Sequence, residues 1–287
     1  MATRKGKYSL LTSFCLAALV IASTVRGESY GLVEEVGPGQ IDWGKGLIHV
    51  VGYGAPPKGA SGPKARLMAR GAAKEDAYRN AAEVLNGLRV NNGTYLRNYV
   101  VQSDEIRLVV EGFIQGARII KSNQYGGGMI ELTIELPLGG EAGLTTLLNR
   151  PEITGRISSS PAMVADYAAT EVTTAYTGVI IDARNLGVKP ALYPQVFDHE
   201  GNLLYTFTMV DIARPGLTTI VAYIRSVDLV RSLPRLGTKP LFLTAERPAP
   251  ADGREQTDLV LGAEAAQAFR RLNPRVIKNG AVAFVID

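Results

Sequence analysis

The sequence predicts an α+β fold in two domains, each a small, mainly antiparallel sheet with helices packed on one face. Three observations predict it. One long stretch with helical spacing is flanked by short stretches in which apolar and polar residues alternate. The second half has more of the short apolar runs that are typical of strands, and a segment rich in Gly, Pro and Ser precedes it. Hydrophobic residues make up 46% of the chain and charged residues 20%, which is typical of a globular protein.

The clearest element is a helix over residues 64–88. Its small and apolar residues recur at steps of three and four and form one stripe: Ala65, Met68, Ala69, Ala72, Ala73, Ala77, Ala81, Val84, Leu85 and Leu88. The stripe is mostly alanine, and small side chains let a helix lie close on a sheet. Glu75, Arg79 and Glu83 lie off the stripe at steps of four, so we expect ion pairs between them on the solvent face.

The residues on either side of this helix continue the α+β pattern. A strand is expected over residues 47–53. Ser103 is a suitable N-cap for a second helix that reaches residue 117, although its β-branched residues leave a strand as the alternative. Residues 117–122 and 129–136 are expected to form a β-hairpin across the three glycines between them. Apolar and polar residues alternate in the second of these strands, so one face is expected to be buried.

Residues 64–136 resemble a known family. The matching parts are ARLMARGAAKEDAYRNAAEVLNG, YVVQSDEIRLVVEGFIQGARII and the strand that ends in IELPL. They are similar to the domain shared by a family of small bacterial outer-membrane lipoproteins and the N-terminal part of flagellar assembly protein T. The most specific parts are the Gln102-Ser103-Asp104 step and the glycines Gly112 and Gly116. The resemblance implies a cell-envelope protein and, in its most specific form, a component of a ring or disc around the flagellar motor.

Residues 1–27 are expected to be a secretory signal peptide. A positively charged start precedes an apolar run of about 13 residues, which is too short to span a bilayer comfortably. Cleavage is expected before Glu28. Cleavage after Thr24 and an uncleaved N-terminal anchor are the alternatives.

Cleavage at this site changes what the charge and the cysteine count imply. Residues 1–27 hold four basic residues and no acidic one, so the mature chain would have 27 Lys+Arg and 27 Asp+Glu. A nucleic-acid partner or direct binding to an anionic membrane is therefore not expected. Cys15, the only cysteine, lies inside the apolar run and not at its end, so no lipid anchor is expected, in contrast to the lipoprotein members of the family. A mature chain without cysteine would have no thiol nucleophile and no cysteine metal site.

Segments rich in Gly, Pro and Ser divide the chain. The expected parts are a leader or linker at 28–46, the first domain at 47–138, a linker at 139–161 with a short helix at 143–148, and a β-rich C-terminal domain at 162–287. Strands are expected in the last domain over residues 177–183, 193–197, 203–208, 218–225, 240–244 and 281–286, with a helix over 263–272. The stretch TGVIIDARNLGVKPALYPQVFDHEGNLLY also resembles a segment that accompanies the first domain in such envelope proteins.

Few polar residues form a pattern that is typical of a catalytic, metal-binding or ligand-binding site. The two histidines, His49 in a strand and His199 at a turn, are expected to be structural. The G-x-S-x-G motif of the α/β hydrolases and the EF-hand spacing are absent. We therefore predict no enzyme, no cofactor and no metal site. The candidates for ligand binding are Asp182, Arg184, Asp198 and Asp211, with an ion pair or a turn as the alternative role of the first two.

The sequence thus predicts a non-enzymatic exported protein with an assembly or structural role in the periplasm or at the periplasmic face of the outer membrane. The expected partners are further copies of the chain or other envelope or flagellar proteins, with no nucleic acid and only indirect association with the membrane. The alternative is a periplasmic binding module for peptidoglycan, another glycan or a small ligand, with the four candidate residues in a cleft between the domains.

Overall fold

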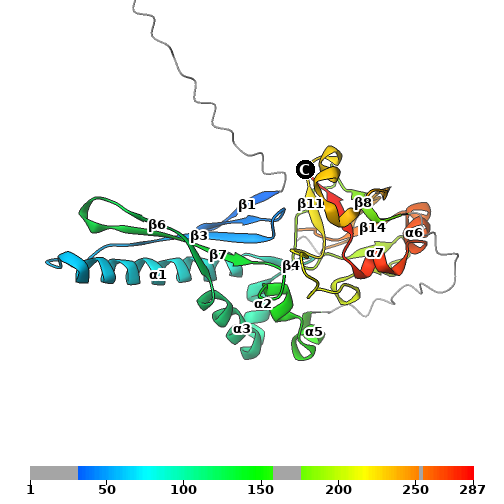
Figure 1. Cartoon of the computed structure of the whole chain (residues 1–287). Coiled ribbons are helices and arrows are strands. Elements are labelled where there is room, and N and C mark those ends of the chain that lie inside the picture. Colours follow the sequence, from blue (N-terminus) through cyan, green and yellow to red (C-terminus); the bar gives the residue numbers. More distant parts are fainter. Residues whose placement is uncertain (1–31, 158–175, 252–254) are drawn as a thin grey trace, which may run out of the picture.

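The computed structural model of the 287-residue chain describes residues 32–157, 176–251 and 255–287, and the predicted signal peptide lies outside them. The α+β class is confirmed (Figure 1): helices accompany a five-stranded sheet in the first half and two four-stranded sheets in the second. Among the described residues, none of the helices combines the length and the hydropathy that crossing a bilayer requires.

The first half is built on a sheet in the order β1-β2-β3-β7-β6, and every neighbouring pair is antiparallel. Its strands are β1 (Val33–Val36), β2 (Gly39–Asp42), β3 (Leu47–Gly54), β6 (Arg118–Gln124) and β7 (Ile130–Pro137). The predicted hairpin is confirmed. Its tip is the 3-10 turn η1 (Gly126–Gly128), in which Gly127 has φ 71° and Gly128 has φ 79°, a conformation that favours glycine.

The prediction that residues 28–46 form a leader or linker is wrong for the part that the structure describes. Residues 33–42 form the β1–β2 hairpin, which extends the sheet beyond β3. Leu32, Ile41 and Trp43 are buried in the main core. Two strands of four residues, rich in Glu and Gly, are too short to show an alternation that separates them from a linker.

The predicted long helix is α1 (Gly62–Asn86), and it lies on one face of this sheet. The buried stripe is narrower than expected, since Met68 and Ala72 are exposed, and it consists of Ala65, Ala69, Ala73, Ala77, Ala81, Val84 and Leu85. On the solvent face Arg79 pairs with Asp76, where Glu75 and Glu83 were the expected partners.

The contact between α1 and β3 is a contact between backbones. A Cβ added to Gly52 of β3 would stand 2.6 Å from the Cα of Ala77. A Cβ on Gly54 would stand 2.9 Å from the carbonyl carbon of Ala72. Only a strand with glycines and a helix with alanines approach each other this closely, so the close packing expected from the alanine stripe is confirmed.

The chain after α1 forms a short hairpin, β4 (Arg89–Asn91) and β5 (Thr94–Tyr95), and two helices, α2 (Leu96–Gln102) and α3 (Asp104–Gln115). A helix after Ser103 is confirmed and the alternative strand is wrong. The Ser103 hydroxyl accepts a hydrogen bond from the backbone N of Ile106 at 3.4 Å, which caps α3.

The linker predicted at 139–161 is packed into the core as far as it is described. The helix expected at 143–148 is confirmed as α4 (Leu144–Leu148), and α5 (Pro151–Ile157) follows it. Leu144, Leu148, Ile153 and Ile157 are all buried in the main core. Leu144 and Leu148 lie four residues apart on α4, and Ile153 and Ile157 lie four apart on α5, so one side of each short helix is apolar. The linker prediction is therefore wrong for these residues. It rested on the Gly and Pro content of the segment and overlooked the four-residue spacing of its apolar residues.

The second half contains a sheet in the order β11-β15-β8-β12, and every neighbouring pair in it is parallel. Its strands are β8 (Gly178–Asp182), β11 (Ala222–Ile224), β12 (Pro240–Thr244) and β15 (Val282–Val285). The expectation of a mainly antiparallel sheet is therefore wrong here. Parallel neighbours need long crossovers, and this sheet pairs β8 with the last strand of the chain. Its central strands are apolar, apart from Asp182 at the end of β8, because both of their faces are buried.

A second four-stranded sheet, in the order β10-β9-β14-β13, mixes parallel and antiparallel pairs. Its strands are β9 (Val196–Asp198), β10 (Leu203–Tyr205), β13 (Arg247–Pro248) and β14 (Leu259–Leu261). The helix α6 (Ala263–Arg270) lies on it with Ala266 and Phe269 buried, as predicted. The remaining elements are α7 (Pro274–Lys278) and the 3-10 helices η2 (Phe207–Met209), η3 (Val227–Ser232) and η4 (Pro234–Leu236).

One hydrophobic core runs through both halves of the chain. It contains residues of α1 and β7 together with residues of β8, β11 and β15. The ring of Trp43, after β2, meets Tyr223 of β11 edge-on with 5.6 Å between the ring centroids. Tyr223 in turn meets Phe284 of β15 at 5.9 Å. The two halves are therefore packed against each other by apolar contact.

The backbone contact of α1 with β3 predicts that Gly52→Ala lowers the free energy of unfolding. The added methyl group meets backbone atoms that cannot rotate away, so the loss is expected to be at least about 1–3 kcal/mol in a urea titration. The matched control is Gly71→Ala, at an exposed position of α1 where a Cβ meets nothing within 4 Å. That variant is expected to gain up to about 1 kcal/mol. Equal urea midpoints for Gly52→Ala and the wild type would contradict the contact.

Candidate functional site

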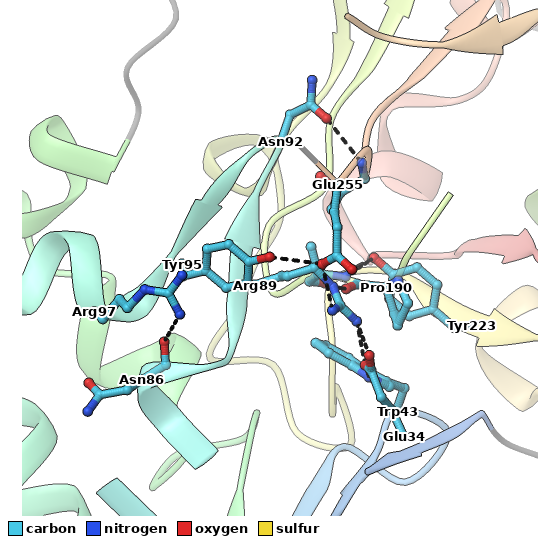
Figure 2. A network of polar contacts seen from close by, with 12 residues as sticks. Glu34, Trp43, Asn86, Arg89, Asn92, Tyr95, Arg97, Pro190, Tyr223 and Glu255 are labelled. Carbon is cyan, nitrogen blue, oxygen red and sulfur yellow. Dashed lines mark hydrogen bonds and ion pairs between the residues drawn. The ribbon is translucent and has the colours of Figure 1, made fainter. Parts of the chain in front are cut away.

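A cluster of polar side chains lies where the two halves meet, with Arg89 of β4 at its centre (Figure 2). The Arg89 side chain is only 8% exposed. Its Nε donates to the carbonyl oxygen of Pro190 at 2.8 Å, and its Nη1 donates to Oε2 of Glu255 at 3.0 Å. Its Nη2 donates to both carboxylate oxygens of Glu34. One guanidinium therefore joins β1, β4 and two segments of the second half.

Further donors hold the two carboxylates in place (Figure 2). The indole Nε1 of Trp43 donates to Oε2 of Glu34 at 3.0 Å. The hydroxyl of Tyr95 donates to Oε2 of Glu255 at 3.0 Å. Glu34 thus meets donors from two different elements, an arrangement that orients it toward Arg89.

The charges in the cluster stabilise one another. Burial alone would lower the pKa of Arg89, because it disfavours the cation. The hydrogen bonds and negative charges of Glu34 and Glu255 outweigh burial and raise the pKa above its ordinary value. The pKa of the Tyr95 hydroxyl is raised by burial and by its bond to Glu255. The cluster is therefore suited to joining the two halves as a permanent ion network and not to moving a proton.

Backbone hydrogen bonds extend this junction along β4. Leu192 N donates to Arg89 O at 2.9 Å, and Tyr193 N donates to Val90 O at 2.7 Å. At the end of β4, the side chain of Asn92 accepts from Thr257 N at 3.1 Å and donates to the carbonyl oxygen of Pro250 at 2.6 Å. The start of the short strand β4 and the residue after its end are thus bonded to the second half.

The sequence candidates Asp182 and Arg184 bind each other. Arg184 Nε donates to Asp182 Oδ1 at 2.9 Å, and Nη2 donates to Oδ2 at 2.6 Å. These hydrogen bonds lower the pKa of Asp182 and raise that of Arg184. The pair at the end of β8 is the ion pair that the sequence analysis gave as the alternative.

Asp198 and Asp211 lie in different surroundings. Asp198 is fully buried, accepts from the backbone N of Glu200 at 2.9 Å and of Asn202 at 2.8 Å, and forms an ion pair with Arg270. It therefore organises the β9–β10 turn. Asp211 is exposed and borders a cavity of about 630 Å³ whose lining includes none of the other three candidates.

The two histidines have the surroundings of structural residues. His49 Nε2 lies 2.9 Å from Oε2 of Glu135 on the neighbouring strand, so the hydrogen-bonded strand residue is confirmed. His199 lies at the β9–β10 turn with its Nε2 3.9 Å from Glu200 Oε1. Within the ranges that the structure describes, no group of three or more His, Cys, Asp or Glu side chains is placed to hold a metal ion.

Asp258 is a buried acid that the sequence analysis missed. It lies directly before β14 and is 2% exposed. Its Oδ1 accepts from Gln195 N at 3.1 Å and from the Thr257 hydroxyl at 2.8 Å. Burial raises the pKa of this carboxyl to about 7, and the two hydrogen bonds offset only part of the effect. The sequence contains one sign of this buried acid, because Asp258 directly precedes the short apolar run of residues 259–261.

Residues 178–287 match the family described as the second domain of the Treponema pallidum protein Tp0624. The matched range starts at β8 and contains both four-stranded sheets of the second half. It begins 16 residues after the domain start predicted at 162 and leaves the first half unmatched. No curated protein matches the chain.

The junction predicts that Arg89→Ala is strongly destabilising. The substitution leaves two carboxylates without their buried cation, so a loss of about 3–5 kcal/mol is expected in chemical denaturation. Arg79→Ala, which removes an exposed pair with Asp76 on α1, is the control and is expected to change stability by less than about 1 kcal/mol. Similar losses for the two variants would show that the junction does not depend on Arg89.

The raised pKa of Asp258 predicts a pH dependence of stability. The folded protein holds a proton between about pH 4 and 7 that the unfolded chain has released, so stability falls as the pH rises through this range. Asp258→Asn is expected to remove the decline and to be more stable above pH 7, by up to about 4 kcal/mol. Thermal unfolding from pH 4 to 8 measures it. The control is Asp211→Asn, at an exposed position, whose unfolding temperature should depend on pH as that of the wild type does. An unchanged pH dependence in Asp258→Asn would contradict the prediction.

Proposed function

We propose that this chain is a non-enzymatic exported protein of the bacterial cell envelope, with an assembly or structural role in the periplasm or at the periplasmic face of the outer membrane. Its most specific form is a component of a ring or disc around the flagellar motor. One similarity supports the proposal: residues 64–136 resemble the domain shared with flagellar assembly protein T.

The observation that carries the proposal is a projecting arm. The first half of α1, the end of β3 and the β6–β7 hairpin extend away from the second half of the chain (Figure 1). A separate small core of Ala69, Ala73, Ile130 and Leu132 holds the two layers of the arm together. Because helix and strand touch through their backbones at Gly54, the arm is thin and resists bending. Such a projection is suited to contact a neighbouring subunit.

Exposed apolar side chains are concentrated on this arm. Leu67 on α1 is 71% exposed and Tyr53 on β3 is 51% exposed, and the others are Met68, Ile120, Tyr125 and Met129. Contiguous exposed apolar side chains commonly mark a protein contact, and on this arm they come from both the helix layer and the sheet layer. The arm also includes β6, the last strand of its sheet, and within the described ranges no further strand pairs with its outer edge. These features favour an assembly role over a self-contained one.

The proposal predicts that the protein isolated from its native cells lies in an outer-membrane or basal-body fraction and has a native mass of several copies or of a mixed complex. Leu67→Lys is expected to reduce that assembly without lowering the unfolding temperature, because the side chain is exposed. The control is Val101→Lys on α2, where the side chain is 87% exposed but lies outside the arm. It is expected to leave the assembly intact.

Two results would contradict the proposal. A soluble periplasmic monomer with intact motility in a deletion strain would remove the flagellar version and favour the alternative of a binding module for peptidoglycan, another glycan or a small ligand. Equal loss of assembly in Leu67→Lys and Val101→Lys would show that the arm is not the contact surface.

A further inference from the structure

A small polar pocket lies at the edge of the parallel sheet where its strands begin. Its volume is about 300 Å³. Thr177, just before β8, and Ala281, just before β15, line it, together with Asn279. Two arginines, Arg214 and Arg235, complete the polar part of its wall. The pocket is of a size for a small ion or for the charged end of a larger ligand.

Arg235 is a partly buried cation whose side chain contacts a carbonyl oxygen. Its Nη2 donates to the carbonyl oxygen of Thr219 in the chain before β11. Within the described part of the chain, no carboxylate forms an ion pair with it. Burial lowers the pKa of Arg235 to about 10, and the positive charge of Arg214 contributes in the same direction. Arg235 therefore remains charged at neutral pH, and a second arginine, Arg214, lines the same pocket.

The turns that carry these arginines are held rigidly. The Thr177 hydroxyl donates to Leu236 O at 2.7 Å and accepts from Lys239 N at 2.9 Å. Gly237 ends the η4 turn with φ 66°, and a Cβ there would stand 2.6 Å from Cβ of Thr177. Arg214 begins a turn in which its carbonyl accepts from Leu217 N at 3.1 Å. The backbone at both arginines is therefore set before a ligand arrives, and the Arg235 guanidinium is also held by its bond to Thr219, which reduces the entropy cost of binding.

A half-buried cation beside a second cation, with no acidic partner among the described residues, is unfavourable for the fold alone. Arg270, the other half-buried arginine among the described residues of the second half, is paired with Asp198. The guanidinium group offers paired N–H donors that match the oxygens of a carboxylate or a phosphate. An anion between the two arginines would offset both the burial and the repulsion.

We propose that this pocket binds an oxyanion, a carboxylate or phosphate group, between Arg214 and Arg235. The site is independent of the arm and of the envelope role proposed above, so failure of either proposal leaves the other intact. The ligand is the free anion or a larger molecule that presents such a group at the surface.

The test is thermal unfolding of the full chain at pH 7 in sodium phosphate, sodium acetate and sodium chloride at equal ionic strength. A saturable rise of Tm in phosphate, in acetate or in both, relative to chloride, is expected for the wild type. Arg235→Met and Arg214→Met are expected to weaken the apparent affinity at least about tenfold, since each removes a charged hydrogen-bond donor to the anion. Arg271→Met, at an exposed position that ends α6 and lies outside the pocket lining, is the control and should keep the full rise.

Phosphate also stabilises proteins in general, and this effect raises the Tm of the wild type and of every variant alike. A Tm rise that is smaller in the Arg214 and Arg235 variants than in the wild type is therefore due to binding in the pocket. In chloride, Arg235→Met is expected to be at least as stable as the wild type because it removes a cation that lacks an acidic partner. If Arg235→Met does not fold, Arg214→Met decides the question, because its side chain is exposed. A rise restricted to one oxyanion assigns the chemical class. Equal Tm values in the three salts, or an unchanged rise in Arg214→Met and Arg235→Met, would overturn the proposal.

Discussion

The buried guanidinium of Arg89 is the interaction on which the arrangement of the two halves depends. A cation taken out of water costs several kcal/mol unless anions and hydrogen-bond acceptors replace the water. Here Glu34 comes from β1, Glu255 from the chain before β14 and the carbonyl of Pro190 from the loop before β9. The charge is satisfied only when all three segments are in place, so the cluster favours one relative position of the halves over others. The neighbouring apolar contact of Trp43 with Tyr223 stabilises the junction without regard to direction, whereas the ion network fixes the orientation of the two halves.

The position of Arg89 follows from the packing of α1. The helix ends at Asn86, and β4 begins three residues later, so the placement of the helix decides where the guanidinium enters the junction. Glycine at position 52 and alanine at 77 let helix and strand touch, which leaves little freedom for the helix to slide. One end of α1 therefore leads into the shared core, while the other end extends into the arm with its own small core. The same helix serves the internal packing and the surface proposed for assembly.

The charged groups of the second half fall into two kinds. Asp182 with Arg184, and Asp198 with Arg270, neutralise each other inside the chain and have the geometry of structural pairs. Arg235 has a carbonyl partner and a neighbouring cation, and none of the acidic residues in the described ranges pairs with it. A ligand site needs groups whose charge the protein itself does not neutralise, and this is why the pocket between Arg214 and Arg235 is a stronger candidate than the residues that were conspicuous in the sequence.

By itself the sequence determined the elements whose signal is local. The alanine stripe produced α1, the Ser103 cap produced α3, and the three glycines produced the β6–β7 hairpin, because caps, turns and helical periods depend on residues a few positions apart. The tertiary structure alone decided the rest. It placed residues 33–42 in the first sheet, turned the predicted linker into buried helices, and paired β8 with a strand about a hundred residues later in a parallel sheet. It also brought Arg89 to Glu255 and Arg214 to the same pocket as Arg235. Pairing over such separations depends on which surfaces can be buried together and which charges must then be neutralised, and neither is contained in a short stretch of sequence.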